Sequence, residues 1–203
     1  MIATLIIFLC TLACSMPLGL LICTIRKSKF AVLQAIAKLY ISIMRGTPLM
    51  LQLLVVFFGP YYIFGISVPA SFRFYAVIIG FSMNYAAYFA EIFRAGIEGI
   101  PRGQYEAADV LGYSKGQTFW KIIFPQMVKR VLPPVTNEII TLVKDTSLAF
   151  ALAYTEMFTL AKQVAAAQAS IMPLFVAGIF YYLFNFLVAF LMGRLEAKLS
   201  YYE

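Results

Sequence analysis

Long runs of apolar residues separated by short charged stretches dominate the sequence. A helix needs roughly 20 consecutive apolar residues to cross a bilayer, and five runs approach that length. The pattern therefore predicts an all-α membrane protein with five transmembrane helices. The predicted spans are residues 1–25, 48–66, about 74–93, about 131–153 and 173–192.

The fourth run differs from the others because it contains prolines and charges. Pro133 and Pro134 interrupt its start, since proline lacks the backbone N–H that a helix interior needs. Glu138, Lys144 and Asp145 lie within it, and charged side chains are costly in a bilayer. We expect these charges to face a cavity or a neighbouring helix.

Composition supports placement in a membrane. The chain is 63% hydrophobic and only 12% charged, whereas soluble domains carry about 25% charged residues. The first apolar run is followed by the basic cluster at residues 26–29. A signal peptide places its positive charges before the apolar core, so this run is predicted to be a retained helix with its N-terminus outside.

The distribution of basic residues predicts the orientation. Cytoplasmic loops carry an excess of Lys and Arg, which makes residues 26–47, residues 94–130 and the tail after Gly193 cytoplasmic. Every Lys and Arg lies in or beside these regions except Arg73, Lys144 and Lys162. The net charge of +7 therefore reflects topology, and nucleic acid is not an expected partner. Residues 31–45 form an amphipathic helix candidate that leads into the second span.

Catalytic and metal sites have little support. The chain has no histidine, and its cysteines, Cys10, Cys14 and Cys23, all lie in the first run without a Cys-x-x-Cys pair. A zinc site or a Cys/His nucleophile pair is therefore not expected, and we interpret the cysteines as small apolar residues. No repeat or second domain is evident, so residues 1–203 are predicted to form a single domain.

A charged stretch between the third and fourth runs contains two short helix candidates. Residues 103–111 are good helix formers, and Gly112 can adopt the left-handed conformation that ends a helix. Ser114 can cap a second helix over residues 115–123. The expected result is a sharp two-helix elbow, although an amphipathic loop resting on lipid headgroups fits the composition equally well.

The spacing within this stretch resembles the signature of binding-protein-dependent ABC transporter permeases. That signature comprises Glu106-Ala107-Ala108, Gly112, Ile122, Phe124 and Pro125; Phe124 departs from it, because the family more often has Leu there. Similarity to the polar amino acid subgroup extends over nearly the whole chain, through Arg45-Gly46-Thr47-Pro48, residues 90–97, Asn137-Glu138 and residues 144–148. Family members generally carry a further short segment before the first span.

The resemblance implies a coupling role for the elbow. In the family this stretch docks on a separate ATPase subunit, so a cytoplasmic coupling segment is expected at about residues 97–125, with residues 106–120 making the contact. The expected coupling residues are Glu106, Ala107, Ala108, Gly112, Tyr113 and Trp120. No G-x-x-x-x-G-K-[ST] phosphate loop occurs, so the chain is not expected to be an enzyme. ATP and Mg would be bound by the partner ATPase.

The resemblance also implies the setting: an importer of polar amino acids in the bacterial inner membrane. Its expected partners are a second permease subunit and an extracytoplasmic amino acid-binding protein. A passive channel for small polar solutes remains an alternative, although it would not need a coupling elbow. An intramembrane enzyme has little support, because no metal, Ser-Lys or paired-Asp site is evident.

Polar residues within the spans are the candidates for substrate binding. Asn84, Tyr88 and Glu91 recur at i, i+4 and i+7 and so share one helical face; we interpret Glu91 with Arg94 as a structural pair. In the family, residues at the positions of Asn84 and Glu138 line the substrate site. The predicted substrate-binding residues are Asn84, Glu138, Gln52 and Tyr88.

Each of these assignments has a structural alternative. Glu138 could be a hydrogen-bonded structural carboxylate, and Gln52 could join two helices. Lys144 and Asp145 are more simply structural than ligand contacts, and Lys144 could pair with a charge on a neighbouring helix. The Tyr61–Tyr62 pair is a weaker candidate.

Overall fold

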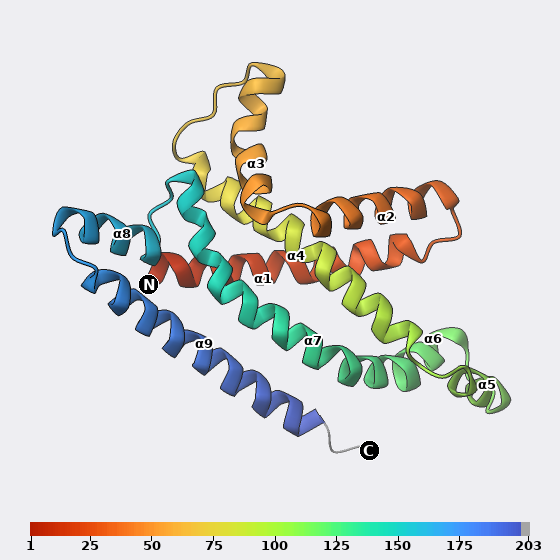
Figure 1. The fold of residues 1–203 in the computed structure, drawn as a ribbon. Helices are drawn as coiled ribbons and strands as arrows, with labels where there is room; N and C mark the ends of the chain where they lie inside the picture. Colours follow the sequence, from red (N-terminus) through yellow and green to blue (C-terminus); the bar gives the residue numbers. More distant parts are fainter. Residues whose placement is uncertain (200–203) are drawn as a thin grey trace.

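A computed structural model of the chain describes residues 1–199, and every regular element in that range is helical. The helices are arranged as an open bundle in which α1, α4, α7 and α9 lie lengthwise and α5 and α6 project at one end (Figure 1). Their bounds are α1 Ile2–Arg26, α2 Ala31–Gly46, α3 Leu49–Phe64, α4 Phe72–Glu98, α5 Arg102–Val110, α6 Lys115–Thr118, α7 Phe124–Asp145, α8 Met157–Ala167 and α9 Met172–Leu199.

Three helices in the described range are long and apolar enough to cross a membrane: α1, α4 and α9. A fourth crossing is possible if α2 and α3, which are bent by 111° at a short break, count as one span. The first, third and fifth predicted spans are therefore confirmed as helices of sufficient length. The α3 helix covers the second, but its 16 residues extend only about 24 Å, short of the roughly 30 Å hydrocarbon core.

The centre of the bundle is α4, which packs closely on α1. Small residues make this approach possible: Ala86 and Ala90 on α4 are fully buried, and a Cβ added at Gly19 of α1 would lie 2.7 Å from the Cβ of Phe89. That separation is well inside van der Waals contact, so the two backbones meet where Gly19 has no side chain. Small residues at the contact allow membrane helices to pack in this way.

The bend between α2 and α3 follows from the sequence at residues 46–48. Thr47 and Pro48 both have extended backbones, as expected because a residue before proline disfavours the helical conformation. The amphipathic helix predicted over residues 31–45 is confirmed as α2, which runs alongside α1 (Figure 1).

The helix at the fourth predicted span has other bounds than the predicted 131–153, and α7 is not among the helices in residues 1–199 that are long and apolar enough to cross a membrane. The α7 helix begins at Phe124 and continues through Pro133 and Pro134, because buried neighbours such as Val131 and Val135 hold that stretch in the core. After Asp145 the chain tightens into a 3₁₀ helix over Thr146–Leu152. The Thr146 hydroxyl donates to the Val143 carbonyl at 2.7 Å, and such local bonds compete with the α-helical pattern.

The α8 helix was not predicted. Its N-terminus is capped by Glu156, whose carboxylate accepts hydrogen bonds from the backbone N–H groups of Phe158 and Thr159, each at 2.7 Å. The Tyr181 hydroxyl of α9 donates to the same carboxylate at 2.9 Å. Glu156 is only 2% exposed, so this cap joins α8 to α9 inside the protein.

Candidate functional site

A polar cavity of about 340 Å³ lies between the α2–α3 bend, α4 and α7. Its walls carry amide, hydroxyl and carboxylate groups from elements far apart in sequence. The lining residues are Thr47, Pro48, Leu49, Asn84, Tyr85, Tyr88, Glu138, Thr141 and Asp145. Three of the four predicted substrate-binding residues, Asn84, Tyr88 and Glu138, are therefore brought together.

Two residues of α4 face the cavity as their spacing predicts. Asn84 and Tyr88 line it, whereas Glu91, one turn further along, lies outside it. The Glu91 carboxylate pairs with Arg94 at 2.8 Å and also contacts Arg26 of α1. The predicted Glu91–Arg94 pair is thus present, with Arg26 as an unpredicted third member.

Gln52 does not line the cavity, although it was predicted to bind substrate. Its amide nitrogen donates to the carbonyls of Met44 and Thr47 at 3.0 and 3.1 Å and to the Thr47 hydroxyl at 2.8 Å. Its amide oxygen accepts from the Asn84 amide at 2.9 Å. Gln52 therefore connects the α2–α3 bend to α4 through hydrogen bonds and orients Asn84. This arrangement matches the alternative in which Gln52 joins two helices.

This network gives a prediction for stability. We expect Gln52→Met to lower the free energy of unfolding by about 1–3 kcal/mol, because it removes the partner of a buried amide. For a chain of this size the melting midpoint should fall by roughly 2–4 °C for each kcal/mol lost. Thermal unfolding of the purified protein measures the change. Leu51→Met at the neighbouring exposed position is the control, and equal midpoints for the two variants would contradict the role of Gln52.

The two carboxylates of the cavity differ in their partners. Glu138 and Asp145 are seven residues apart on one face of α7, and both line the cavity as that spacing predicts. The Asp145 carboxylate accepts a hydrogen bond from the Tyr85 hydroxyl at 2.7 Å. Within residues 1–199, Glu138 takes part in no hydrogen bond or ion pair, so its carboxylate remains free to accept donors from a bound molecule.

Sequence reasoning missed Tyr85 and Thr141. Tyr85 is only 1% exposed. Because it follows Asn84 directly, it does not share the helical face of Asn84 and Tyr88, so the spacing that identified those two residues did not predict the contact of Tyr85 with Asp145. Thr141 could have been found, because Glu138, Thr141 and Asp145 recur at i, i+3 and i+7 on one helical face.

Some candidate residues lie away from the cavity. Tyr61 and Tyr62 are 54% and 79% exposed near the end of α3, with their rings packed edge to face. Lys144 is exposed, and in the described part of the chain it forms no ion pair with another helix. The cavity is therefore built without these three residues.

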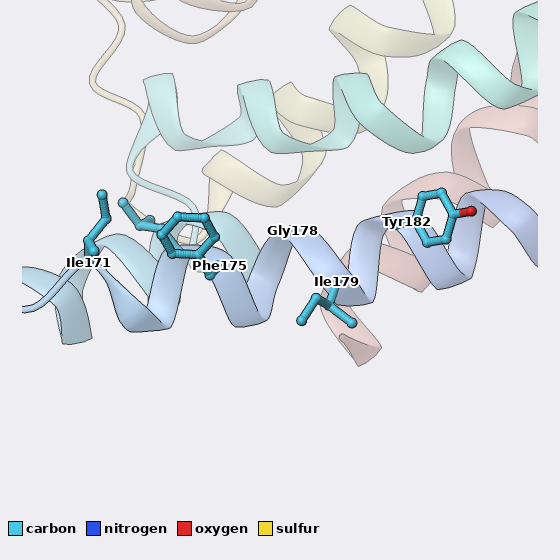
Figure 2. Close-up of a pocket in the computed structure, with 6 residues that line it drawn as sticks. Ile171, Phe175, Gly178, Ile179 and Tyr182 are labelled. Atoms are coloured by element: carbon cyan, nitrogen blue, oxygen red, sulfur yellow. The ribbon is translucent and has the colours of Figure 1, made fainter.

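A second, apolar groove lies on the outer surface of α9. It has a volume of about 410 Å³, and its lining includes Ile171, Phe175, Gly178, Ile179 and Tyr182 (Figure 2). The Tyr182 hydroxyl is its one polar side-chain group. Sites for small polar molecules combine several convergent polar groups, so this groove is not the candidate site.

The elbow segment, residues 102–123, largely follows its prediction. The α5 helix ends at Val110, and Gly112 has a φ of +75°, the left-handed conformation that glycine adopts without strain. Ser114 caps α6 through a capping box, in which its hydroxyl accepts from the Gln117 N–H at 3.3 Å and the Gln117 side chain accepts from the Ser114 N–H at 2.9 Å.

The second helix of the elbow is not a separate short helix. It continues from α6 through a π-helical segment, Phe119–Ile123, directly into α7. Pro125 explains why this turn is wider than an α-helical turn. Proline has no backbone N–H, so the carbonyl of Lys121, four residues earlier, receives no α-helical hydrogen bond from it. The Phe124 N–H donates instead to the Phe119 carbonyl, five residues back. The elbow is thus a continuous helical extension of α7, with α5 in contact with it.

Side chains of the elbow divide into inward and outward groups. Ala108 is fully buried against the chain itself, and the Lys121 ammonium lies 5.7 Å from the centre of the Tyr113 ring. Glu106 and Ala107 are exposed. The most exposed large apolar side chains are Val110, Leu111 and Trp120, which are 88%, 72% and 64% exposed.

Comparison with known proteins decides the family. A family model described as "Binding-protein-dependent transport system inner membrane component" matches residues 15–201. The chain belongs to this family. As a member of these ABC transporter permeases, it is a helical, multi-pass subunit of the membrane rather than an enzyme.

Relatives within the family include amino acid permeases. The chain is 36% identical to the arginine transport system permease protein ArtQ of Bacillus subtilis (90% of this chain and 83% of ArtQ). It is 38% identical to the probable amino-acid ABC transporter permease protein YckA of the same organism (98% and 87%), and 34% identical to its L-cystine transport system permease protein TcyB (92% and 79%).

Solved structures share the fold. A crystal structure of an amino acid ABC transporter with histidines matches with a TM-score of 0.88 and 29% identity, covering 98% of this chain and 91% of that chain. An inward-facing MetNI methionine ABC transporter matches with a TM-score of 0.73. At 18% identity, the latter likeness concerns the fold alone.

Proposed function

We propose that the chain is the transmembrane subunit of an ATP-driven importer of polar amino acids, which receives substrate from an extracytoplasmic binding protein. The observation that carries this proposal is the Glu138 carboxylate, which lines the polar cavity without a hydrogen-bond or ion-pair partner in residues 1–199. A carboxylate binds an ammonium group through charge-assisted hydrogen bonds. Asn84 and Tyr88 supply amide and ring contacts beside it.

Relatives are named for arginine, glutamine and cystine transport, and these substrates share only the α-amino and carboxylate groups. The Asn84 amide nitrogen already donates to the Met44 carbonyl and to the Gln52 amide oxygen, so Asn84 and Glu138 present acceptor oxygens that suit the shared α-amino group. We therefore assign recognition of the α-amino group to Glu138 and Asn84 in this cavity.

The elbow segment provides the proposed contact with a separate ATPase. Three of its apolar side chains, Val110, Leu111 and Trp120, are more than 60% exposed and form a surface suited to a groove on a partner. Because α6 and the π segment continue into α7, movement of the elbow would be transmitted to the helix that carries Glu138. Packed elements move as bodies in this way during hinge and shear motions. Two permease subunits, identical or related, would serve the ATPase dimer.

The proposed orientation places the elbow in the bacterial cytoplasm and the N-terminus outside. The C-terminal ends of α1, α4 and α9 lie toward the same end of the molecule as the elbow (Figure 1), and the basic residues concentrate there. Residues 200–203 of the tail lie outside the described residues. Cytoplasmic loops of membrane proteins carry such an excess of positive charge.

Reporter fusions test this orientation. We expect an alkaline phosphatase fused after Tyr113 to be inactive and a green fluorescent protein at the same place to be fluorescent, since both results indicate the cytoplasm. Insertions within residues 66–71 should give the opposite pattern. Phosphatase activity after Tyr113 would overturn the orientation together with the proposed ATPase contact.

Uptake by cells tests the function as a whole. Cells expressing the chain with its binding protein and ATPase should accumulate radiolabelled arginine, glutamine or cystine, and inactivation of the ATPase should abolish accumulation of whichever is taken up. Competition among the three identifies the preferred substrate. Uptake that survives loss of the ATPase would indicate a passive channel instead.

A further inference from the structure

A second polar cavity lies next to the candidate substrate cavity, on the side toward the elbow. Its volume is about 550 Å³, and it is lined by Arg45, Glu91, Ile92, Ala95, Gly96, Arg130 and Pro134. None of these residues lines the first cavity. We call the two spaces the upper cavity, which contains Asn84 and Glu138, and the lower cavity, which contains Arg45 and Arg130.

The order of residues along two helices shows that the cavities follow one another. On α4, Asn84 and Tyr88 line the upper cavity, and Ala95, further toward the elbow, lines the lower one. On α7 the order is reversed, because the helix runs back from the elbow: Arg130 lines the lower cavity and Glu138 the upper one. The two spaces therefore share the walls of a single path.

One contact lies at the boundary. The guanidinium carbon of Arg45 is 5.2 Å from the centre of the Tyr88 ring, within the range of a cation–π interaction. Arg45, in the last turn of α2, lines the lower cavity, and Tyr88 lines the upper one. The contact thus joins a residue that lines one cavity to a residue that lines the other.

We propose that the Arg45–Tyr88 pair is a gate that closes the upper cavity toward the elbow side. This inference rests on the proposed function, because it treats the two cavities as one transport path. Arg45 is exposed and lines the lower cavity, so its side chain has open space into which it can move away from Tyr88. A cation–π contact is weak enough to open and specific enough to re-form. Separation of α2 from α4 would break it and join the two cavities.

The test measures access to the upper cavity without any need for transport. All three cysteines are replaced by alanine, and Thr141→Cys introduces a thiol into the upper cavity. The purified protein, with its ATPase, is reconstituted in vesicles with the elbow side outward and treated with a membrane-impermeant methanethiosulfonate. With the pair intact we expect slow labelling. Removing the guanidinium with Arg45→Met, or the ring with Tyr88→Leu, should accelerate labelling roughly threefold to thirtyfold.

Two controls separate a gate from a general loosening of the fold. Ala95→Cys, in the lower cavity, should be labelled rapidly and at the same rate with or without Arg45→Met. Tyr88→Phe keeps the ring and should leave the labelling of Thr141→Cys slow. The gate is disproved if Thr141→Cys reacts as fast as Ala95→Cys in the intact pair, or if both disruptive variants leave it slow. Because labelling requires no substrate, such a result would not disprove the transport function, nor would a failure of uptake disprove the gate.

Discussion

Gly112→Val should reduce ATP-driven uptake at least about tenfold while the protein still inserts in the membrane. The φ of Gly112 is +75° and a Cβ added there meets no atom within 4 Å, so the penalty is confined to the backbone. A β-branched residue held in this conformation costs on the order of 1–3 kcal/mol. The chain would relieve that strain by reorienting α5 relative to α6, which moves Val110 and Leu111 away from Trp120.

Two measurements distinguish this explanation from misfolding. Uptake and co-purification of the ATPase should fall together, whereas the yield of membrane-inserted protein should not change. Gly116→Val is the matched control, because Gly116 also has open space around it but lies in α6 without a positive φ. Normal uptake by Gly112→Val, or equal losses in the two variants, would refute the requirement for this conformation.

Glu138→Gln should lower substrate affinity about tenfold to a hundredfold, because a hydrogen bond to a charged group contributes roughly 1.5–3 kcal/mol. The substitution preserves side-chain size and removes the charge. No hydrogen bond or ion pair of Glu138 occurs in residues 1–199, so its loss should leave folding and ATPase assembly nearly unchanged. A purely structural carboxylate would give the reverse result, with poor assembly and normal affinity.

Binding to the purified complex makes this comparison directly. The dissociation constant is measured for whichever of radiolabelled arginine, glutamine or cystine the wild type takes up, alongside the melting midpoint. Glu98→Gln removes an equal charge at the end of α4, where Glu98 pairs with Arg94 outside both cavities, and should leave the affinity unchanged. An unaltered dissociation constant in a well-assembled Glu138→Gln complex would exclude this residue from the site.

Relations between residues on one helix could be predicted from the sequence. The spacing of Asn84 and Tyr88, and that of Glu138 and Asp145, sets which side chains share a face. The left-handed Gly112 and the Ser114 cap are likewise local, since a turn and a cap are decided within a few residues. These features needed no knowledge of what packs against them.

Relations between helices could not be predicted in the same way. Gln52 reaches Asn84 because the chain bends at Thr47. The direction of that bend could not be predicted from the sequence. Glu156 caps α8 although glutamate is not a favoured N-cap residue, because Tyr181 of α9 helps to hold its carboxylate. Burial and distant partners outweighed local preference at both positions.

The π-helical segment Phe119–Ile123 lies between α6 and α7, which together form one continuous helix. It therefore determines how the side chains of α6 are rotated around the helix axis relative to those of α7. Each residue of an α-helix rotates the side-chain direction by about 100° around the helix axis. The wider turn therefore sets the angle around this axis between the Trp120 and Glu138 side chains. Loss of one residue from this segment would leave a helical rod of nearly the same length. The side chains on the elbow side of the deletion would then be rotated by about 100° around the helix axis, so Trp120 would face a different direction relative to Glu138.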